Sequence, residues 1–220
     1  MSVALLEPLE GVLHMGAAAL GVGLDARQET QLLGYLDLLD KWNAVYNLSA
    51  VRERQKMLTH HVLDSLAIVP LIRRLGSRTL LDVGSGAGLP GLVLAIAIPE
   101  LAVTLVDAVQ KKTAFLTQVK GELGLSVRVN HARVEALTVD ENYDCIASRA
   151  FSSLSDLVRL AAAQIRPGGV FVAMKGAPSA AEIAGLPAPW QVRETLALTV
   201  PGLHAARCAL VIGKPETGTS

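Results

Sequence analysis

Residues 80–91 are LLDVGSGAGLPG, in which four glycines occur within eight positions directly after a short apolar run. Glycine at this density lets a backbone turn sharply and approach a ligand closely. The segment therefore predicts a strand ending near Val83, a ligand-binding turn and the start of a helix, as in open α/β sheets.

From Thr79 onward, short apolar runs alternate with helical segments. Seven runs are strand candidates: TLLDV, AVTLVD, VRVN, YDCIAS, GVFVAMK, VRETLALTV and ARCALVIG. This alternation predicts an α/β fold with a mostly parallel sheet covered by helices on both faces. Because only PGLHA separates the last two candidates, we expect the sheet to end in an antiparallel hairpin.

The residues before this region have a helical pattern. Asp25 is a candidate N-cap for a helix whose leucines recur every three or four positions. A second helix is predicted from Arg54 to Arg74. The predicted organisation is a helical extension over residues 1–76, an α/β domain over 77–213 and a frayed tail over 214–220.

Composition excludes several classes of protein. Apolar residues make up 51% of the 220 and charged residues 18%, unlike a disordered chain. No run is long and apolar enough to cross a membrane, and the first basic residue, Arg27, comes too late for a secretory signal. Cys145 and Cys208 lack metal or redox spacing. We expect a cytoplasmic, monomeric protein without a metal or a membrane partner.

Charge is distributed unevenly although the net charge is zero. Residues 1–40 carry a net charge of −5, and residues 41–80 carry +5. A basic block beside a neutral domain is typical of phosphate contacts, although solvated helix faces give the same pattern. The candidate phosphate contacts are Arg52, Arg54, Lys56, Arg73, Arg74 and Arg78, with Lys111 and Lys112.

The glycine loop fits two ligand-binding patterns. Gly86 to Gly91 matches the G-x-G-x-x-G of dinucleotide sites, whereas Asp82 to Gly88 forms an acid-first pattern. A pyrophosphate gains nothing from the Asp82 carboxylate, but the cationic methionine end of S-adenosylmethionine would. Pro90 also removes one amide donor from the helix start. The acid-first frame is favoured.

Asp107, at the end of the second strand, suits the ribose hydroxyls of an adenosine. This residue does not distinguish NAD from S-adenosylmethionine, and it could instead cap the following helix.

Several further segments carry a specific resemblance: KWNAVYNLSAVRE (41–53), HHVLDSLAIVPLI (60–72), ARVEAL (132–137), SRAF (148–151) and MKG (174–176). Together with the glycine loop, they resemble the bacterial small-subunit ribosomal RNA guanine-N7 methyltransferases, also called the glucose-inhibited division protein B family. The resemblance extends from about Leu32 to Val211.

This resemblance implies a class I S-adenosylmethionine-dependent methyltransferase with a Rossmann-like, seven-stranded sheet and a helical extension. The implied target is N7 of one guanine, position 527, in 16S rRNA, either as naked rRNA or in an assembling small subunit. The implied cofactor-binding residues are Gly84, Gly86 and Leu89 in the loop, Asp107 at the ribose, Val134 and Glu135 at the adenine, and Arg149 at the cofactor and target pocket.

Guanine N7 is already nucleophilic and has no proton to lose, so no general base is expected. No catalytic residue is assigned. His60 and His61 are interpreted as packed or surface residues, and Arg149 could alternatively pair with Asp144 or Glu135. A methyltransferase for another RNA or a small molecule, an NAD-dependent oxidoreductase and a non-enzymatic RNA-binding protein remain alternatives.

Overall fold

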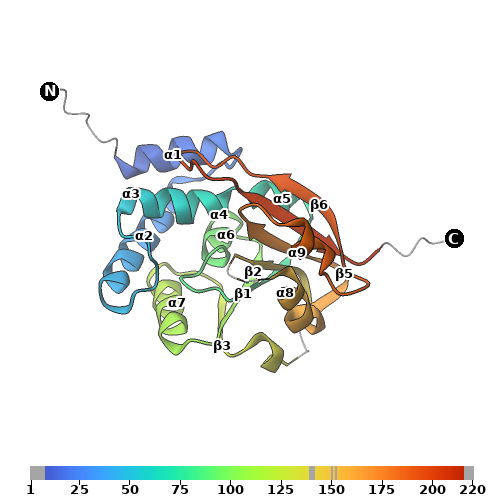
Figure 1. Cartoon of the computed structure of the whole chain (residues 1–220). Coiled ribbons are helices and arrows are strands. Elements are labelled where there is room, and N and C mark those ends of the chain that lie inside the picture. Colours follow the sequence, from blue (N-terminus) through green and yellow to red (C-terminus); the bar gives the residue numbers. More distant parts are fainter. Residues whose placement is uncertain (1–7, 139–141, 150, 152, 216–220) are drawn as a thin grey trace.

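A seven-stranded sheet lies at the centre of the computed structural model, which describes residues 8–138, 142–149, 151 and 153–215 (Figure 1). The strands are β1 (Thr79–Val83), β2 (Ala102–Asp107), β3 (Arg128–His131), β4 (Tyr143–Ser148), β5 (Ile165–Lys175), β6 (Gln191–Ala197) and β7 (Cys208–Gly213). Their spatial order is β3-β2-β1-β4-β5-β7-β6.

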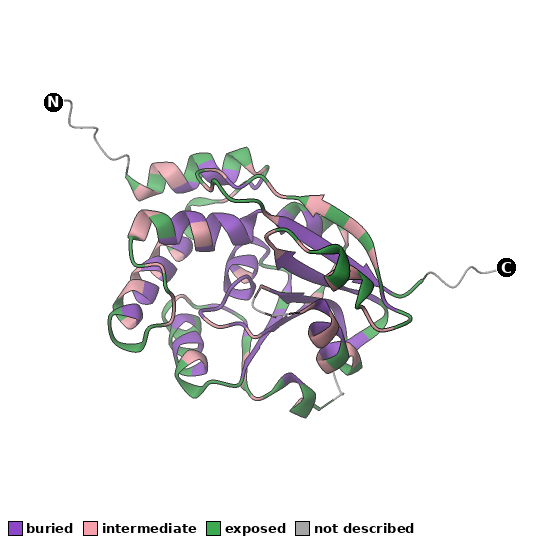
Figure 2. Cartoon of the chain, viewed as in Figure 1, coloured by how far each residue is buried: buried purple, intermediate pink, exposed green. Residues whose placement is uncertain are grey.

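The first five strands are parallel, and β7 is antiparallel to both β5 and β6. The predicted mostly parallel sheet with an antiparallel C-terminal pair is therefore confirmed. β5 begins at Ile165, earlier than predicted, because a register shift between Tyr143 and Cys145 accommodates the segment Pro167-Gly168-Gly169. Alternating β6 residues are half-buried and exposed at the sheet edge (Figure 2).

The helices before the sheet are α1 (Leu9–Ala19), α2 (Ala26–Tyr46), α3 (Arg54–Met57), the π-helical turn η1 (Leu58–Leu63), α4 (Asp64–Leu66) and α5 (Val69–Arg74). Those among and after the strands are α6 (Gly91–Ala97), α7 (Gln110–Glu122), α8 (Leu154–Ala161) and α9 (Ala180–Ala184). Two 3₁₀ turns, η2 (Val134–Ala136) and η3 (Ala162–Gln164), complete the described elements.

The predicted cap of α2 is confirmed. The Asp25 carboxylate accepts the Gln28 N–H at 2.8 Å, and the Gln28 amide oxygen accepts the Asp25 N–H at 2.8 Å. Each side chain satisfies a backbone donor that the first helical turn leaves unpaired.

The single helix predicted over residues 54–74 is instead a series of helical segments. Pro70 lies in the first turn of α5, and its missing N–H cannot continue the hydrogen-bond ladder from α4. Within α4, the Ser65 hydroxyl donates to the His61 carbonyl at 2.7 Å, inside the region where the helix widens into η1.

The helical extension shares its hydrophobic core with the sheet. One cluster joins Tyr35 and Leu36 of α2 to Phe115 of α7 and to the sheet residues Leu80 and Val103. On the opposite face, α8 and Trp190 cover a second cluster that contains Leu81 and Ile146. The boundary predicted at residues 76 and 77 thus marks a change of sequence pattern within a continuous core. Residues 216–220 of the predicted tail lie outside the described residues.

We expect the extension and the sheet to unfold together. Trp42 of the extension contacts Phe115, whereas Trp190 packs on Phe171 of β5, so W190F and W42F leave one fluorescence probe on each side. The two probes should report the same urea midpoint. Phe115→Ala should lower the unfolding free energy by about 3–5 kcal/mol, and both probes should report the same decrease. Two separate midpoints would show that the extension unfolds independently.

Candidate functional site

The glycine loop crosses the carboxyl ends of β1 and β2. The Gly84 and Ser85 N–H groups both donate to the Val106 carbonyl, at 2.9 and 3.1 Å. At Gly88 the φ angle is +88°, and a Cβ would lie 2.2 Å from Leu92 Cδ1. The turn therefore needs glycine here for both its backbone conformation and its packing.

Asp82 lies beneath the loop, fully buried at the end of β1. One carboxylate oxygen, Oδ2, accepts the Gly91 N–H at 2.9 Å, and a Cβ on Gly91 would lie 2.7 Å from that oxygen. The other oxygen, Oδ1, is buried without a hydrogen-bond partner among the described residues. Burial raises the pKa of Asp82 to about 7, although the Gly91 N–H partly offsets the rise.

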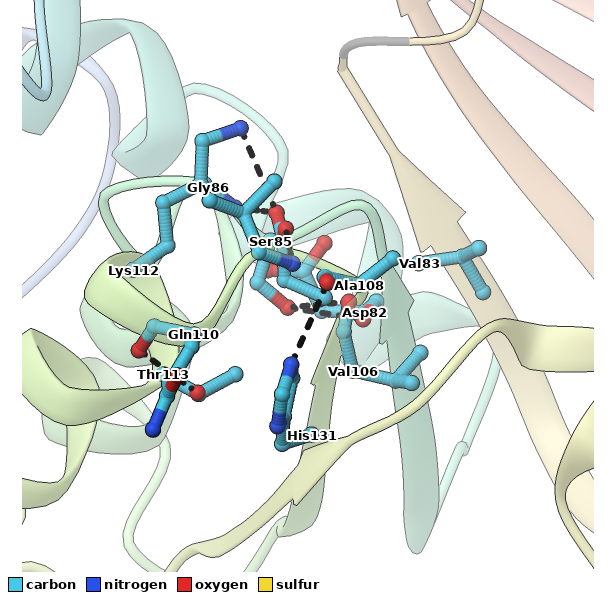
Figure 3. Close-up of polar contacts among 12 residues, drawn as sticks. Asp82, Val83, Ser85, Gly86, Val106, Ala108, Gln110, Lys112, Thr113 and His131 are labelled. Carbon is cyan, nitrogen blue, oxygen red and sulfur yellow. Dashed lines mark hydrogen bonds and ion pairs between the residues drawn. The ribbon is translucent and has the colours of Figure 1, made fainter.

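Asp107 fixes the other side of the loop. Its Oδ2 accepts the Gly86 N–H at 2.9 Å, and its Oδ1 accepts the Val109 N–H at 2.9 Å. The ammonium of Lys112 lies 3.5 Å from Oδ2, along the dashed line that leads from Lys112 in Figure 3. The N-cap of α7 is Val109, so the alternative that Asp107 caps this helix is wrong.

Tyr35 connects the helical extension to the loop. Its hydroxyl donates to the Ala87 carbonyl at 2.9 Å from a fully buried position on α2. Burial raises the pKa of the Tyr35 phenol above its ordinary value. The sequence analysis missed this contact, although a tyrosine within the apolar stripe of a helix is a recognisable signal that its hydroxyl has a buried partner.

The other predicted cofactor residues lie at the same edge of the sheet. Leu89 is buried in the loop, and its N–H donates to the Ser85 carbonyl at 3.0 Å. Val134 and Glu135 follow β3 in the turn η2, where Val134 is buried and Glu135 is exposed. The loop thus gathers Gly84, Gly86, Leu89 and Asp107, while Val134, Glu135 and Arg149 come from neighbouring strand ends.

Arg149 follows β4 beside the start of the glycine loop, because the adjacent Ser148 hydroxyl donates to the Val83 carbonyl at 2.9 Å. Its Nη1 donates to the His60 carbonyl at 2.9 Å and to Asp64 Oδ2 at 3.2 Å. The predicted alternative partners, Asp144 and Glu135, are therefore wrong. Asp144 is at the start of β4, at the opposite edge, where it pairs with Arg166 at 2.7 Å.

Asp64 joins three parts of the chain. It belongs to α4, its side chain is only 1% exposed, and its Oδ1 accepts the Arg207 Nε at 3.1 Å. Arg149 and Arg207 thus hold one carboxylate from two sides. This triad lines a cavity of about 360 Å³, whose other lining residues are Val51, His60, His61, Met174, Lys175 and Gly176.

His61 is packed, as predicted, but it also lines this cavity. Its Nε2 lies 2.7 Å from the Ser49 hydroxyl, and its Nδ1 is buried without a partner among the described residues. Burial, with the nearby Arg149 charge, lowers the pKa of His61 to about 4, so the ring is neutral at pH 7.

The predicted basic block is divided between two edges of the sheet. Near the carboxyl edge, Lys111 donates to the Tyr46 carbonyl at 3.0 Å and Arg52 to the Asn43 carbonyl at 2.7 Å. At the amino edge, Arg73 donates to the Ala97 carbonyl at 3.1 Å, and Arg78 directly precedes β1. The helical segments from α3 to α5 run between the edges and separate the two groups.

The donor set of the loop fits S-adenosylmethionine better than a dinucleotide. Two buried carboxylates, Asp82 and Asp107, flank the loop, and an unpartnered carboxylate oxygen suits a cationic ligand rather than a pyrophosphate. Within the described residues, no helix is long and apolar enough to cross a membrane. The same residues contain no group of three or more His, Cys, Asp or Glu side chains that could hold a metal ion.

Comparison with known proteins identifies a family. Residues 28–211 match the family model described as rRNA small subunit methyltransferase G. Ribosomal RNA small subunit methyltransferase G of Ralstonia nicotianae is 53% identical over 207 residues, which cover 91% of this chain and 93% of that protein. The protein of the same name from Acidovorax ebreus is 51% identical over 96% of this chain and 97% of its own length.

Solved methyltransferase structures share the fold. TrmN from Thermus thermophilus has a TM-score of 0.54 at 22% identity and covers 68% of this chain and 48% of its own. An S-adenosylmethionine-dependent methyltransferase from Thiobacillus denitrificans, in complex with S-adenosyl-L-homocysteine, has a TM-score of 0.52 at 15% identity, covering 69% of this chain and 90% of its own.

We predict that Asp82→Asn changes the pH dependence of stability in the absence of cofactor. The folded pKa, about 7, exceeds the ordinary value of 3.8, so the folded state binds the extra proton between these values and rising pH destabilises the wild type. Asparagine does not titrate. Relative to wild type, the variant should gain about 3 kcal/mol of unfolding free energy between pH 5 and pH 8.

Urea unfolding at the two pH values measures this difference. Asp156→Asn, at a half-buried aspartate of α8 that pairs with Arg159, is the matched control and should show no such change. A difference between wild type and D82N that is equal at pH 5 and pH 8 would contradict the predicted ionisation.

Proposed function

The chain belongs to the rRNA small subunit methyltransferase G family, and from this membership we propose that it transfers the methyl group of S-adenosylmethionine to N7 of a guanine in 16S rRNA. The family match over residues 28–211 carries the proposal. The acid-first glycine loop, flanked by Asp82 and Asp107, supports the same cofactor.

We propose distinct roles for the residues around the cofactor. The Asp82 carboxylate, whose Oδ1 has no hydrogen-bond partner among the described residues, lies beneath the loop and favours binding of the cationic methionine end. The Asp107 carboxylate accepts hydrogen bonds from the ribose hydroxyls as well as from the Gly86 N–H. Val134 and Glu135 meet the adenine, and the backbone of Gly84, Gly86 and Leu89 shapes the wall between them.

The reaction places few chemical demands on side chains. The N7 lone pair forms a bond to the methyl carbon while the carbon–sulfur bond breaks, and the electron pair of that bond remains on sulfur. No proton leaves N7, so no general base is required. Burial lowers the pKa of His61 to about 4, which makes its ring a weak base and is consistent with this expectation. The protein contributes alignment and exclusion of water.

The RNA partner must present an accessible guanine. N7 in a paired A-form helix lies in a deep, narrow groove, so the target is in a loop or in an open assembly intermediate. We propose that either naked rRNA or an assembling small subunit is the substrate. We further propose that the protein acts as a monomer in the cytoplasm.

Labelled S-adenosylmethionine tests the activity directly. We expect the protein to label one guanine in small-subunit rRNA, naked or as subunits, from cells that lack this methylation, with the position mapped by cleavage at N7-methylguanine. Asp107→Ala should weaken cofactor binding about 10- to 100-fold, because it removes hydrogen bonds to a charged acceptor. Asp156→Ala is the control.

Cofactor binding without label in either form of RNA would overturn the rRNA assignment. Failure to bind S-adenosylhomocysteine, with binding of NAD instead, would restore the dinucleotide interpretation of the loop.

The divided basic residues predict which edge meets RNA. The double variant Arg52→Gln/Lys111→Gln, near the carboxyl edge, should weaken RNA binding and reduce the slope of log affinity against log salt by about 1–2. The amino-edge double variant Arg73→Gln/Arg74→Gln should leave both unchanged. Binding measured over a salt series checks this, and equal effects from both pairs would contradict the assignment.

A further inference from the structure

The cavity beside the glycine loop contains Asp64, Arg149 and Arg207, of which only Arg149 is among the predicted cofactor residues. We propose that this cavity receives the target guanine and that Arg149 and Arg207, braced by Asp64, recognise its O6 atom and thereby distinguish guanine from adenine. This inference rests on the proposed function and assigns the specificity of that reaction.

The position of the cavity fits a methyl acceptor. Arg149 lines it and directly follows Ser148, whose hydroxyl is bonded to the last residue of β1, where the glycine loop begins. The cavity therefore lies next to the cofactor loop at the same edge of the sheet. Its volume of about 360 Å³ is at the small end of ligand pockets, which suits a single base rather than a longer segment of RNA.

Asp64 acts as a brace. Its side chain is 1% exposed, and its two oxygens are occupied by Arg149 and Arg207, at 3.2 and 3.1 Å. The Arg149 and Arg207 side chains are 25% and 29% exposed, and both line the cavity, while the carboxylate stays covered. A planar guanidinium held in this way presents its remaining N–H groups in a fixed direction.

Those N–H groups remain available. Arg149 uses only Nη1, and Arg207 uses Nε and Nη1, in hydrogen bonds with the described residues. The triad carries two positive charges and one negative charge, so the cavity favours an acceptor atom. Lys175, by contrast, is paired with Glu182 at 2.5 Å.

Guanine and adenine differ at this position. Both have N7, but beside it guanine presents the O6 acceptor and adenine an amino donor. N7 itself must stay unbonded in order to attack the methyl group, so arginine donors can contact only O6 in a productive complex. In adenine, the N–H groups of the two arginines would face the N–H groups of the amino substituent. Neither side could accept a hydrogen bond, so adenine is disfavoured.

His61 provides a second, independent observation at the same cavity. The residue is 6% exposed, its Nε2 contacts Ser49, and its Nδ1 has no hydrogen-bond partner in the part of the chain that the structure describes. A buried polar atom at a cavity wall is normally paired, so this atom indicates a bound polar group. The Watson–Crick edge of the same base offers one.

The test pairs a change in the enzyme with a change in the base. Small-subunit RNA is assembled with guanine or 2-aminopurine, which lacks O6, at the target position, and methyl transfer is measured for wild type and Arg207→Gln. We expect Arg207→Gln to slow the guanine reaction about 10- to 100-fold but to change the 2-aminopurine reaction less than threefold. Because each variant rate is divided by the wild-type rate on the same base, the difference in intrinsic reactivity between the two bases cancels.

Asp64→Asn tests the brace. It should slow the guanine reaction and change the 2-aminopurine reaction less than threefold, a combination that a general loss of structure would not give. Arg159→Gln, at an exposed arginine of α8, is the matched control. If Arg207→Gln does not fold, Arg207→Lys replaces it, since lysine keeps the charge but loses the planar fork.

Three outcomes are distinguishable. Selective loss on guanine supports the inference. Equal fold losses on both bases, with normal wild-type activity on guanine, would overturn it while leaving the proposed function intact. No transfer by wild type to guanine RNA would instead remove the proposed function itself.

Discussion

Two buried carboxylates fix the loop on which the rest of the site depends. A glycine-rich turn has too many accessible conformations to hold a ligand unaided, and Asp82 and Asp107 restrict it by accepting the Gly91 and Gly86 amides from opposite sides. The cost is a buried charge, expressed as the raised pKa of Asp82. In the proposed complex a cationic ligand would offset that cost, so the groups that shape the loop would also favour the cofactor.

The helical extension is part of the site and shares the core of the sheet. Tyr35 of α2 holds the loop from one side, and Asp64 of α4 reaches across to the ends of β4 and β7 through two arginines. Because these contacts connect distant segments of the chain, loss of the extension would remove contacts from both the loop and the cavity beside it. Here the packing that stabilises the fold also positions the functional groups.

Methyl transfer to N7 requires no general base, because no proton leaves the acceptor atom. An acceptor that already carries a lone pair needs alignment, a dry environment and discrimination between similar bases. Fixed donors and buried carboxylates supply these more directly than a titrating side chain. The lowered pKa of His61 and the guanidinium groups of Arg149 and Arg207, held by Asp64, are consistent with a site that aligns its acceptor without proton transfer.

Local patterns in the sequence determined the strands, the Asp25 cap, the glycine loop and the family resemblance, because each depends on residues close together along the chain. Tertiary structure decided the rest. It placed Asp64 between Arg149 and Arg207, set Tyr35 on the loop and divided the basic residues between two edges. These pairings join residues 52 to 143 positions apart, and sequence spacing cannot reveal which distant side chains the packing of helices on a sheet brings within hydrogen-bond distance.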